Sequence, residues 1–152
     1  MYCRRIEVEV ELVDGIGYRS RGEFEDAHHY IKADILFQIG GLVLEADAQI
    51  IRAPFDECSQ GVKAIKNLGG TQAIDFKVSK EIYSKVAGPI GCTHLAELVI
   101  ECIKARIQAA EHDKPSWIDP DLLEHRYKVW ENSFANKCIH FTDPYWTPYK
   151  VL

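Results

Sequence analysis

The first third of the chain alternates apolar and polar residues, as β-strands with one buried face do. From Ile6 to Leu12 every second residue is apolar, and glutamates stand between. Because successive side chains of a strand point to opposite faces, a strand over 4–12 presents one apolar face. Turn residues around Gly15 lead into a second strand at 18–25. Gly40-Gly41 separates two more, at 30–39 and 42–53, and is typical of a two-residue hairpin.

Beyond Pro54 the apolar residues recur with helical spacing, so helices follow the strands. The longest predicted helix runs from Thr93 to about Glu111, and Leu95, Leu98 and Cys102 lie on its inward stripe. The other predicted helices cover 56–68, 79–86 with Ser79 as a cap, and a segment that begins at Asp119, with Pro120 in its first position.

These elements predict an α+β fold, an antiparallel meander of about four strands followed by three to four helices, one of them long. No repeat or linker divides the chain, so we expect one domain over residues 1–152. Within it, residues 132–152 are interpreted as an irregular aromatic tail, ending in Pro144-Tyr145-Trp146-Thr147-Pro148-Tyr149. This tail and the long helix favour a homodimer.

Composition narrows the class of protein. The 152 residues include 18 Lys and Arg against 23 Asp and Glu, a net charge of −5, which argues against a nucleic-acid or anionic-membrane partner. No apolar run reaches the roughly 20 residues of a membrane span, and the N-terminus lacks a signal-peptide pattern. We therefore expect a cytoplasmic protein, whose five cysteines are thiols or metal ligands and not disulfides.

The segment Gly91-Cys92-Thr93-His94-Leu95-Ala96-Glu97-Leu98 carries the most specific chemistry. It places a thiol and an imidazole two residues apart where the long helix begins, and the positive end of a helix stabilises a thiolate. Cys and His are also the soft ligands that zinc prefers. Glu97 shares a helix face with His94, so it either orients the imidazole for acid–base chemistry or only complements the helix dipole.

Three further residues are candidate metal ligands. Cys58 opens a predicted helix, Cys138 precedes His140 by two residues, and His29 belongs to a His28-His29 doublet at the start of a strand. Together with Cys92 and His94 they have the residue types of a tetrahedral zinc site. The chain lacks the paired CxxC spacing of zinc ribbons, so metal-free structural thiols remain an alternative. The glycine-rich segments lack the motifs of nucleotide-binding loops.

The run Gly-Cys-Thr-His-Leu-x-Glu-Leu at 91–98 resembles the signature of a bacterial family of unknown function. Arg-Arg-Ile-Glu at 4–7, Cys58 and the late Cys138 with His140 are also similar to that family, although its members usually carry one histidine where this chain has His28 and His29. The resemblance implies that Cys58, Cys92 and His94 meet in space, and it implies no particular reaction.

Three hypotheses follow from these residues. The first is a transition-metal site, zinc favoured, with Cys58, Cys92 and His94 as ligands, His29 or Cys138 completing the set, Glu97 as orienter and a small molecule as substrate. The second is metal-free chemistry, with Cys92 as nucleophile and His94 or His29 as base. The third is a non-catalytic accessory or assembly domain. Whether the protein is an enzyme is left open.

Overall fold

The computed structural model describes residues 1–74, 76–113 and 115–142, which fall into two compact units. The first unit is Met1–Ala109 and contains the sheet and the helices packed on it; the second begins at Ala110. Among the described residues, no helix has both the length and the apolar composition needed to cross a lipid bilayer. The prediction of a single domain over 1–152 stays a prediction.

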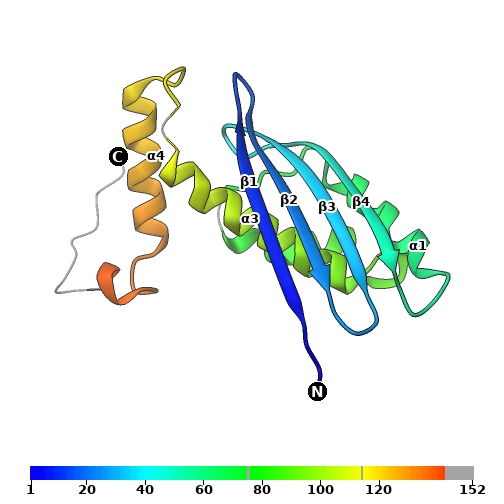
Figure 1. Ribbon diagram of the computed structural model, residues 1–152. Coiled ribbons are helices and arrows are strands. Elements are labelled where there is room, and N and C mark those ends of the chain that lie inside the picture. Colours follow the sequence, from blue (N-terminus) through cyan, green and yellow to red (C-terminus); the bar gives the residue numbers. More distant parts are fainter. Residues whose placement is uncertain (75, 114, 143–152) are drawn as a thin grey trace. The chain divides into compact units, whose positions relative to one another are not determined.

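The described residues form one four-stranded antiparallel sheet in the order β1-β2-β3-β4 (Figure 1). Its strands are β1 (Arg5–Val13), β2 (Gly17–Glu25), β3 (Tyr30–Gln38) and β4 (Val43–Arg52). Each strand pairs with its neighbour in sequence, from Arg5 opposite Glu25 to Phe37 opposite Val43. The predicted meander is therefore confirmed. The hairpin at Gly40-Gly41 is present but is not a two-residue one, because β3 ends at Gln38 and β4 begins at Val43. Of the two glycines, Gly41 has a positive φ, 96°, a conformation that glycine adopts readily.

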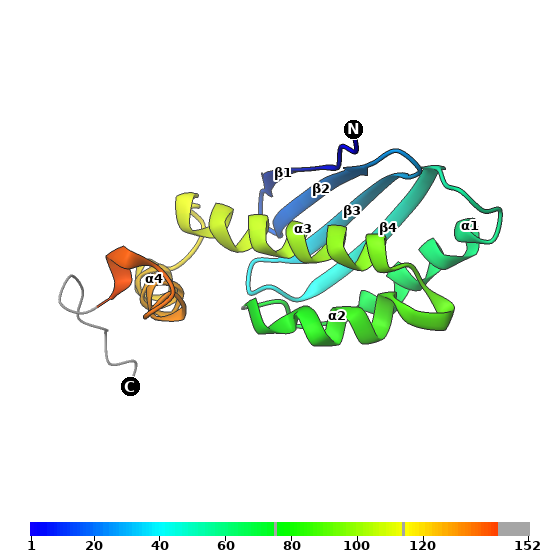
Figure 2. The same cartoon turned by 90° about the horizontal axis from the view of Figure 1, so that it is seen from below.

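The helices of the first unit lie on one face of this sheet (Figure 2). They are α1 (Cys58–Gly61), η1 (Val62–Leu68), η2 (Phe76–Val78), α2 (Ser79–Val86), η3 (Gly88–Ile90) and α3 (Thr93–His112), where η marks a 3-10 helix. The long helix α3 agrees with the prediction within a residue. Together with the meander, it confirms the α+β class.

The core lies between the sheet and the helices. Its largest fully buried side chains are Tyr18, Phe24, Phe37, Ile31, Ile35, Ile65, Leu68, Ile82, Leu95, Leu98, Ile103 and Val43. Helix α3 approaches the sheet closely at Gly22 of β2, where a Cβ atom would lie 2.6 Å from the Cys102 sulfur and 2.8 Å from Leu98 Cδ1. A larger residue at this position would force Cys102 and Leu98 to shift, so glycine lets α3 pack directly on β2.

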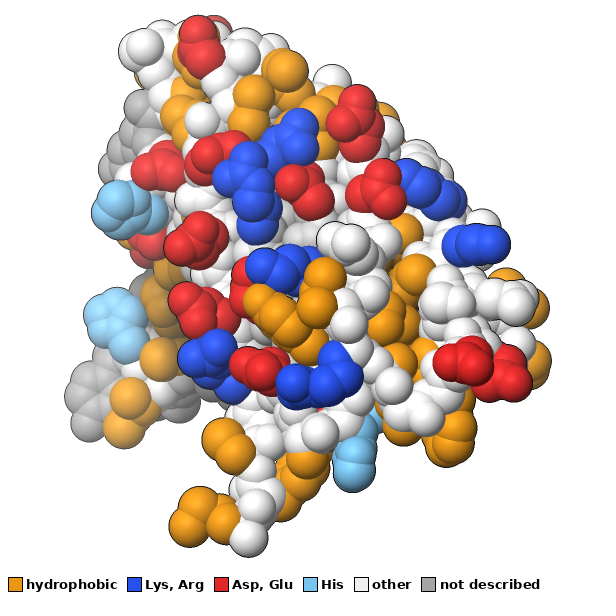
Figure 3. Space-filling model, turned by 45° about the vertical axis from the view of Figure 1, so that its right-hand side comes forward, with side chains coloured by type: hydrophobic (Ala, Val, Ile, Leu, Met, Phe, Trp, Pro, Cys, Tyr) orange, Lys and Arg blue, Asp and Glu red, His pale blue; other side chains and the backbone are white. Residues whose placement is uncertain are grey.

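The opposite face of the sheet carries ion pairs between basic and acidic side chains of its strands. Arg21 bonds Glu11 at 2.7 Å, Arg19 bonds Asp34 at 2.9 Å, and Lys32 bonds Glu23 at 2.6 Å. In the space-filling view, acidic and basic side chains are intermixed (Figure 3). Acidic and basic residues therefore neutralise one another along this face of the sheet.

The segment 56–68 differs from the single α-helix predicted there. The structure has one α-helical turn, α1, followed by the 3-10 helix η1. Glu57 at the N-terminal cap position makes no side-chain hydrogen bond, and Gly61 at the junction has the weakest helix propensity after proline. Ser79 is likewise the first residue of α2 and not its cap, which is Val78.

The second unit contains the helix α4 (Pro120–Ser133) and the 3-10 turn η4 (Ile139–Phe141). The Asp119 carboxylate accepts hydrogen bonds from the backbone N–H groups of Asp121 and Leu122, which confirms the predicted cap. α4 includes Asn132, so helix extends into the segment predicted as an irregular tail. The Pro-aromatic ending of that tail, 144–149, lies outside the described residues.

Candidate functional site

Asp26 organises the connection between β2 and β3. Its Oδ1 accepts hydrogen bonds from the backbone N–H groups of His28 at 2.8 Å and His29 at 2.7 Å. The Asp26 N–H in turn donates to the His29 carbonyl at 3.0 Å. An aspartate side chain that bonds the backbone two and three residues ahead stabilises a tight turn. This turn fixes the position of His29 at the start of β3.

The same carboxylate orients the His29 imidazole. His29 Nδ1 lies 3.0 Å from Asp26 Oδ1 and 3.2 Å from Oδ2, and the Tyr2 phenol donates to Oδ2 at 3.0 Å. Burial raises the pKa of the Asp26 carboxyl, but the hydrogen bonds from His28, His29 and Tyr2 outweigh it and leave the pKa well below its usual range. Since an ionised carboxylate only accepts, His29 Nδ1 carries a proton, and in the neutral ring the lone pair is then on Nε2.

His94, in the first turn of α3, lies against His29. The two ring centroids are 4.1 Å apart with an angle of 37° between the planes, and the buried Phe24 ring lies 5.1 Å from His94. Burial, and next the neighbouring His29, lower the pKa of His94. A histidine with a lowered pKa is neutral at neutral pH and can accept a proton or bind a metal ion.

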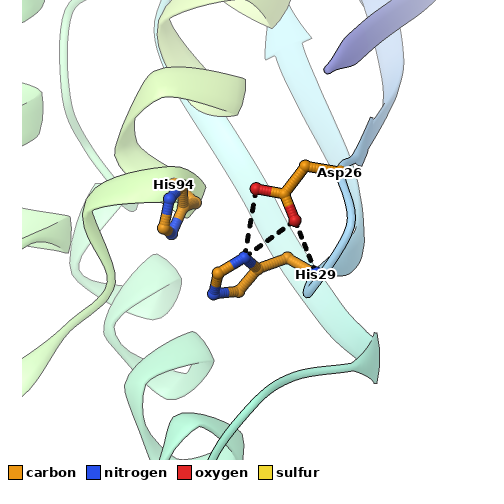
Figure 4. A group of neighbouring side chains, drawn as sticks. All are labelled: Asp26, His29 and His94. Atoms are coloured by element: carbon orange, nitrogen blue, oxygen red, sulfur yellow. Dashed lines mark hydrogen bonds and ion pairs between the residues drawn. The ribbon is translucent and has the colours of Figure 1, made fainter. Parts of the chain in front are cut away.

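Asp26, His29 and His94 form the one group of potential metal-ligand atoms found among the described residues, with all three atoms within 4.8 Å of one another. Figure 4 shows the three side chains pointing toward one another from the β2–β3 turn and the start of α3. The structure thus brings together His29 and His94, two of the residues selected from the sequence. It adds Asp26, which is not among the candidates selected from the sequence.

Glu97 lies one turn after His94 and bonds Arg4. Arg4 donates to Glu97 Oε2 at 2.6 Å, and its guanidinium carbon lies 4.9 Å from the centre of the Phe24 ring. The negative charge of Glu97 favours the protonated form of His94, but less strongly than burial opposes it. The described contact of Glu97 is therefore with Arg4, and its predicted role as an orienter of His94 stays a prediction.

Cys92 and Cys58 lie near the start of α3 but outside the three-residue group. The Cys92 carbonyl accepts a hydrogen bond from the Ala96 N–H at 3.0 Å, so Cys92 stands at the helix start as predicted. A Cβ atom on Gly61 would lie 2.9 Å from the Gly91 oxygen and 3.5 Å from Cys92 Cβ. Helix α1, which begins with Cys58, therefore packs on the turn that carries Cys92.

The remaining cysteines are placed as follows. Cys102 is fully buried, and burial raises the pKa of its thiol to about 12, as expected of a core residue. Cys3 and Cys138 are exposed, and all five cysteines are free. Cys138 and His140 belong to the second unit, so their membership of the site stays a prediction.

Comparison with known proteins assigns the chain to a family. Residues 4–108 match the family model described as Protein of unknown function (DUF2889), so the chain belongs to that family. The match includes Asp26, His29, His94 and the segment 91–98, although our assignment of the signature itself stays an interpretation. Neither the curated proteins nor the solved structures contain a significant match.

The sequence alone does not identify Asp26 as a site residue, because its role depends on a turn and on the packing of α3. The available signal was the spacing Asp26-x-His28-His29 directly after a strand, which is typical of an aspartate that closes a turn onto the residues that follow it. Contact with His94 had no local signal, since it joins residues from β3 and α3.

Proposed function

We propose that this protein binds a transition-metal ion, zinc in particular, through the imidazoles of His29 and His94. The observation that carries this proposal is the Asp26–His29–His94 group, in which three potential ligand atoms lie within 4.8 Å of one another. Metal-binding histidines typically donate their second ring N–H to a carboxylate, which fixes the tautomer and raises ligand basicity. Asp26 stands in this relation to His29.

Asp26 suits the role of orienter better than that of ligand. Its oxygens already accept hydrogen bonds from two backbone N–H groups, an imidazole and a phenol. We propose that thiolates complete the metal site. Cys92 precedes His94 by two residues, and Cys58 lies one helical turn before Gly61, which packs on Cys92. Two imidazoles and two thiolates are a common zinc ligand set.

The ligand count decides what the site does. With both thiolates bound, zinc would be four-coordinate and structural. With one thiolate absent, an open position would hold water or a small molecule, and zinc would lower the pKa of that water. If Cys58 is the absent thiolate, His29, His94 and Cys92 would be ligands and Asp26 would orient His29 in either case.

The second candidate is a metal-free cysteine enzyme, favoured by the position of Cys92 at the start of α3. There the helix dipole would stabilise the thiolate, and His94, neutral at neutral pH, would act as its base. A non-catalytic accessory domain is the third. It predicts that His94→Ala and Cys92→Ser alter only stability.

The test is metal content by mass spectrometry of untagged protein purified without oxygen. We expect about one zinc ion per chain in the wild type, and its loss in His29→Ala and in His94→Ala. The matched control is His112→Ala, whose side chain is 87% exposed, and it should retain the metal. Absence of metal from wild type and variants alike would contradict the proposal. Alkylation kinetics of Cys92 would then test the cysteine enzyme.

A further inference from the structure

Tyr2 and Arg4 make specific contacts at the site although they are exposed and precede the first strand. The Tyr2 phenol donates to Asp26 Oδ2 at 3.0 Å, and Arg4 donates to Glu97 Oε2 at 2.6 Å. Asp26 lies at the β2–β3 turn that carries His29, and Glu97 lies on the helix that carries His94. The segment Met1–Arg4 is therefore tied to both elements that supply the imidazoles.

Arg4 also contacts Phe24, the buried aromatic residue next to His94. Its guanidinium carbon lies 4.9 Å from the centre of the Phe24 ring, a cation–π contact, and that ring lies 5.1 Å from the His94 ring. The Arg4 side chain thus packs between Glu97 and the ring that supports His94. Its neighbour Arg5 instead bonds Glu25, on the second strand.

We propose that Tyr2 and Arg4 are positioning residues, which hold Met1–Arg4 beside the imidazole pair through their bonds to the Asp26 and Glu97 carboxylates. Tyr2 donates to Asp26 Oδ2, the oxygen that lies 3.2 Å from His29 Nδ1. Arg4 keeps Glu97 bonded to itself and away from the imidazoles. The inference rests on the proposed function, because it takes the His29–His94 pair as the site.

The contacts of Tyr2 and Arg4 are weak enough for the segment Met1–Arg4 to leave the site and return to it. The Arg4 and Glu97 side chains are 41% and 29% exposed, and ion pairs of this kind contribute little free energy. The segment can therefore leave the site without unfolding the sheet, which begins at Arg5. Opening would give metal ions or small molecules access to His29 and His94.

The test is the rate at which diethyl pyrocarbonate acylates each histidine of metal-free protein, read by peptide mass spectrometry. This reagent modifies accessible neutral imidazoles. We expect Tyr2→Phe and Arg4→Gln each to increase acylation of His29 and His94 about fivefold, the factor for losing one exposed contact. Arg4→Lys, which keeps the charge, should restore most of the protection.

The matched control is Arg5→Gln, which should leave the rates at His29 and His94 unchanged. His28 and His112 are exposed and serve as the reference for reagent reactivity, and circular dichroism checks that every variant is folded. Equal rates in wild type and in the Tyr2 and Arg4 variants would overturn the inference, and so would an equal increase in Arg5→Gln. Because no metal is present, this result is independent of whether the protein binds zinc. Failure here and failure of the proposed metal site are therefore distinguishable.

Discussion

At the scale of single residues, Asp26 determines how the site is built. Its carboxylate closes the turn and orients His29, so it acts on both backbone and side chain. The place of Cys92 and His94 could be predicted from the sequence because the start of a long helix shows in the apolar spacing. The pairing of His29 with His94 could not, since it depends on how α3 crosses the sheet.

We expect Asp26→Asn to destabilise the protein by roughly 2–4 kcal/mol at neutral pH, because it removes a buried, hydrogen-bonded carboxylate. The pKa of the Asp26 carboxyl is lower in the folded than in the unfolded protein. Its stabilisation is therefore present above the unfolded value and is lost as pH falls through the folded value. The difference in unfolding free energy between wild type and variant should shrink below about pH 4.

Urea unfolding at neutral pH and at about pH 3 measures this difference. The control is Asp34→Asn, because the Asp34 side chain is 38% exposed and pairs with Arg19 on the open face of the sheet. It should cost less than about 1 kcal/mol at either pH. A cost for Asp26→Asn that does not change with pH would contradict this account.

At the scale of elements, the four-strand meander can be predicted from the local sequence pattern, whereas the structure of the first helical segment, 56–68, cannot. Alternation and the Gly-Gly hairpin define the strands because one sheet face is buried and the turn demands glycine. The segment 56–68 has helical spacing, yet it becomes α1 and η1, and Gly61 at their junction packs on Gly91 and Cys92. That contact is tertiary and has no local signal.

The packing of α3 on β2 gives a prediction for Gly22. We expect Gly22→Ala to lower the unfolding free energy by about 1–3 kcal/mol, because the new methyl group would overlap the Cys102 sulfur and Leu98. Gly40→Ala is the matched control, since nothing lies within 4 Å of its added Cβ atom. Chemical denaturation of both variants checks the prediction. Equal stability of the two variants would mean that α3 does not approach β2 so closely.

At the scale of the whole molecule, the site described here lies entirely in the first unit. The unit Met1–Ala109 holds Asp26, His29 and His94, and it also holds Cys58 and Cys92. Within α4, the helix of the second unit, the described residues include none that are fully buried. Cys138 and the expected homodimer stay predictions at this scale.

Truncation after His112, the end of α3, tests whether the chain up to that point is sufficient for folding and for zinc binding. We expect the shortened protein to unfold in one cooperative transition and to bind zinc as tightly as the full chain, because the proposed ligands all remain. Calorimetry and zinc titration against a competing chelator measure both properties. A shortened protein that folds but loses zinc affinity would instead show that Cys138 or His140 completes the site.

The most direct measurement of the central claim is a zinc titration followed by imidazole nitrogen NMR of the metal-free full-length protein. We predict that His29 begins in the tautomer with the proton on Nδ1, as its bond to Asp26 requires. On addition of about one equivalent of zinc, His29 Nε2 and one nitrogen of His94 should shift together. If neither histidine responds, or if only exposed histidines such as His28 and His112 respond, the account of this site is wrong.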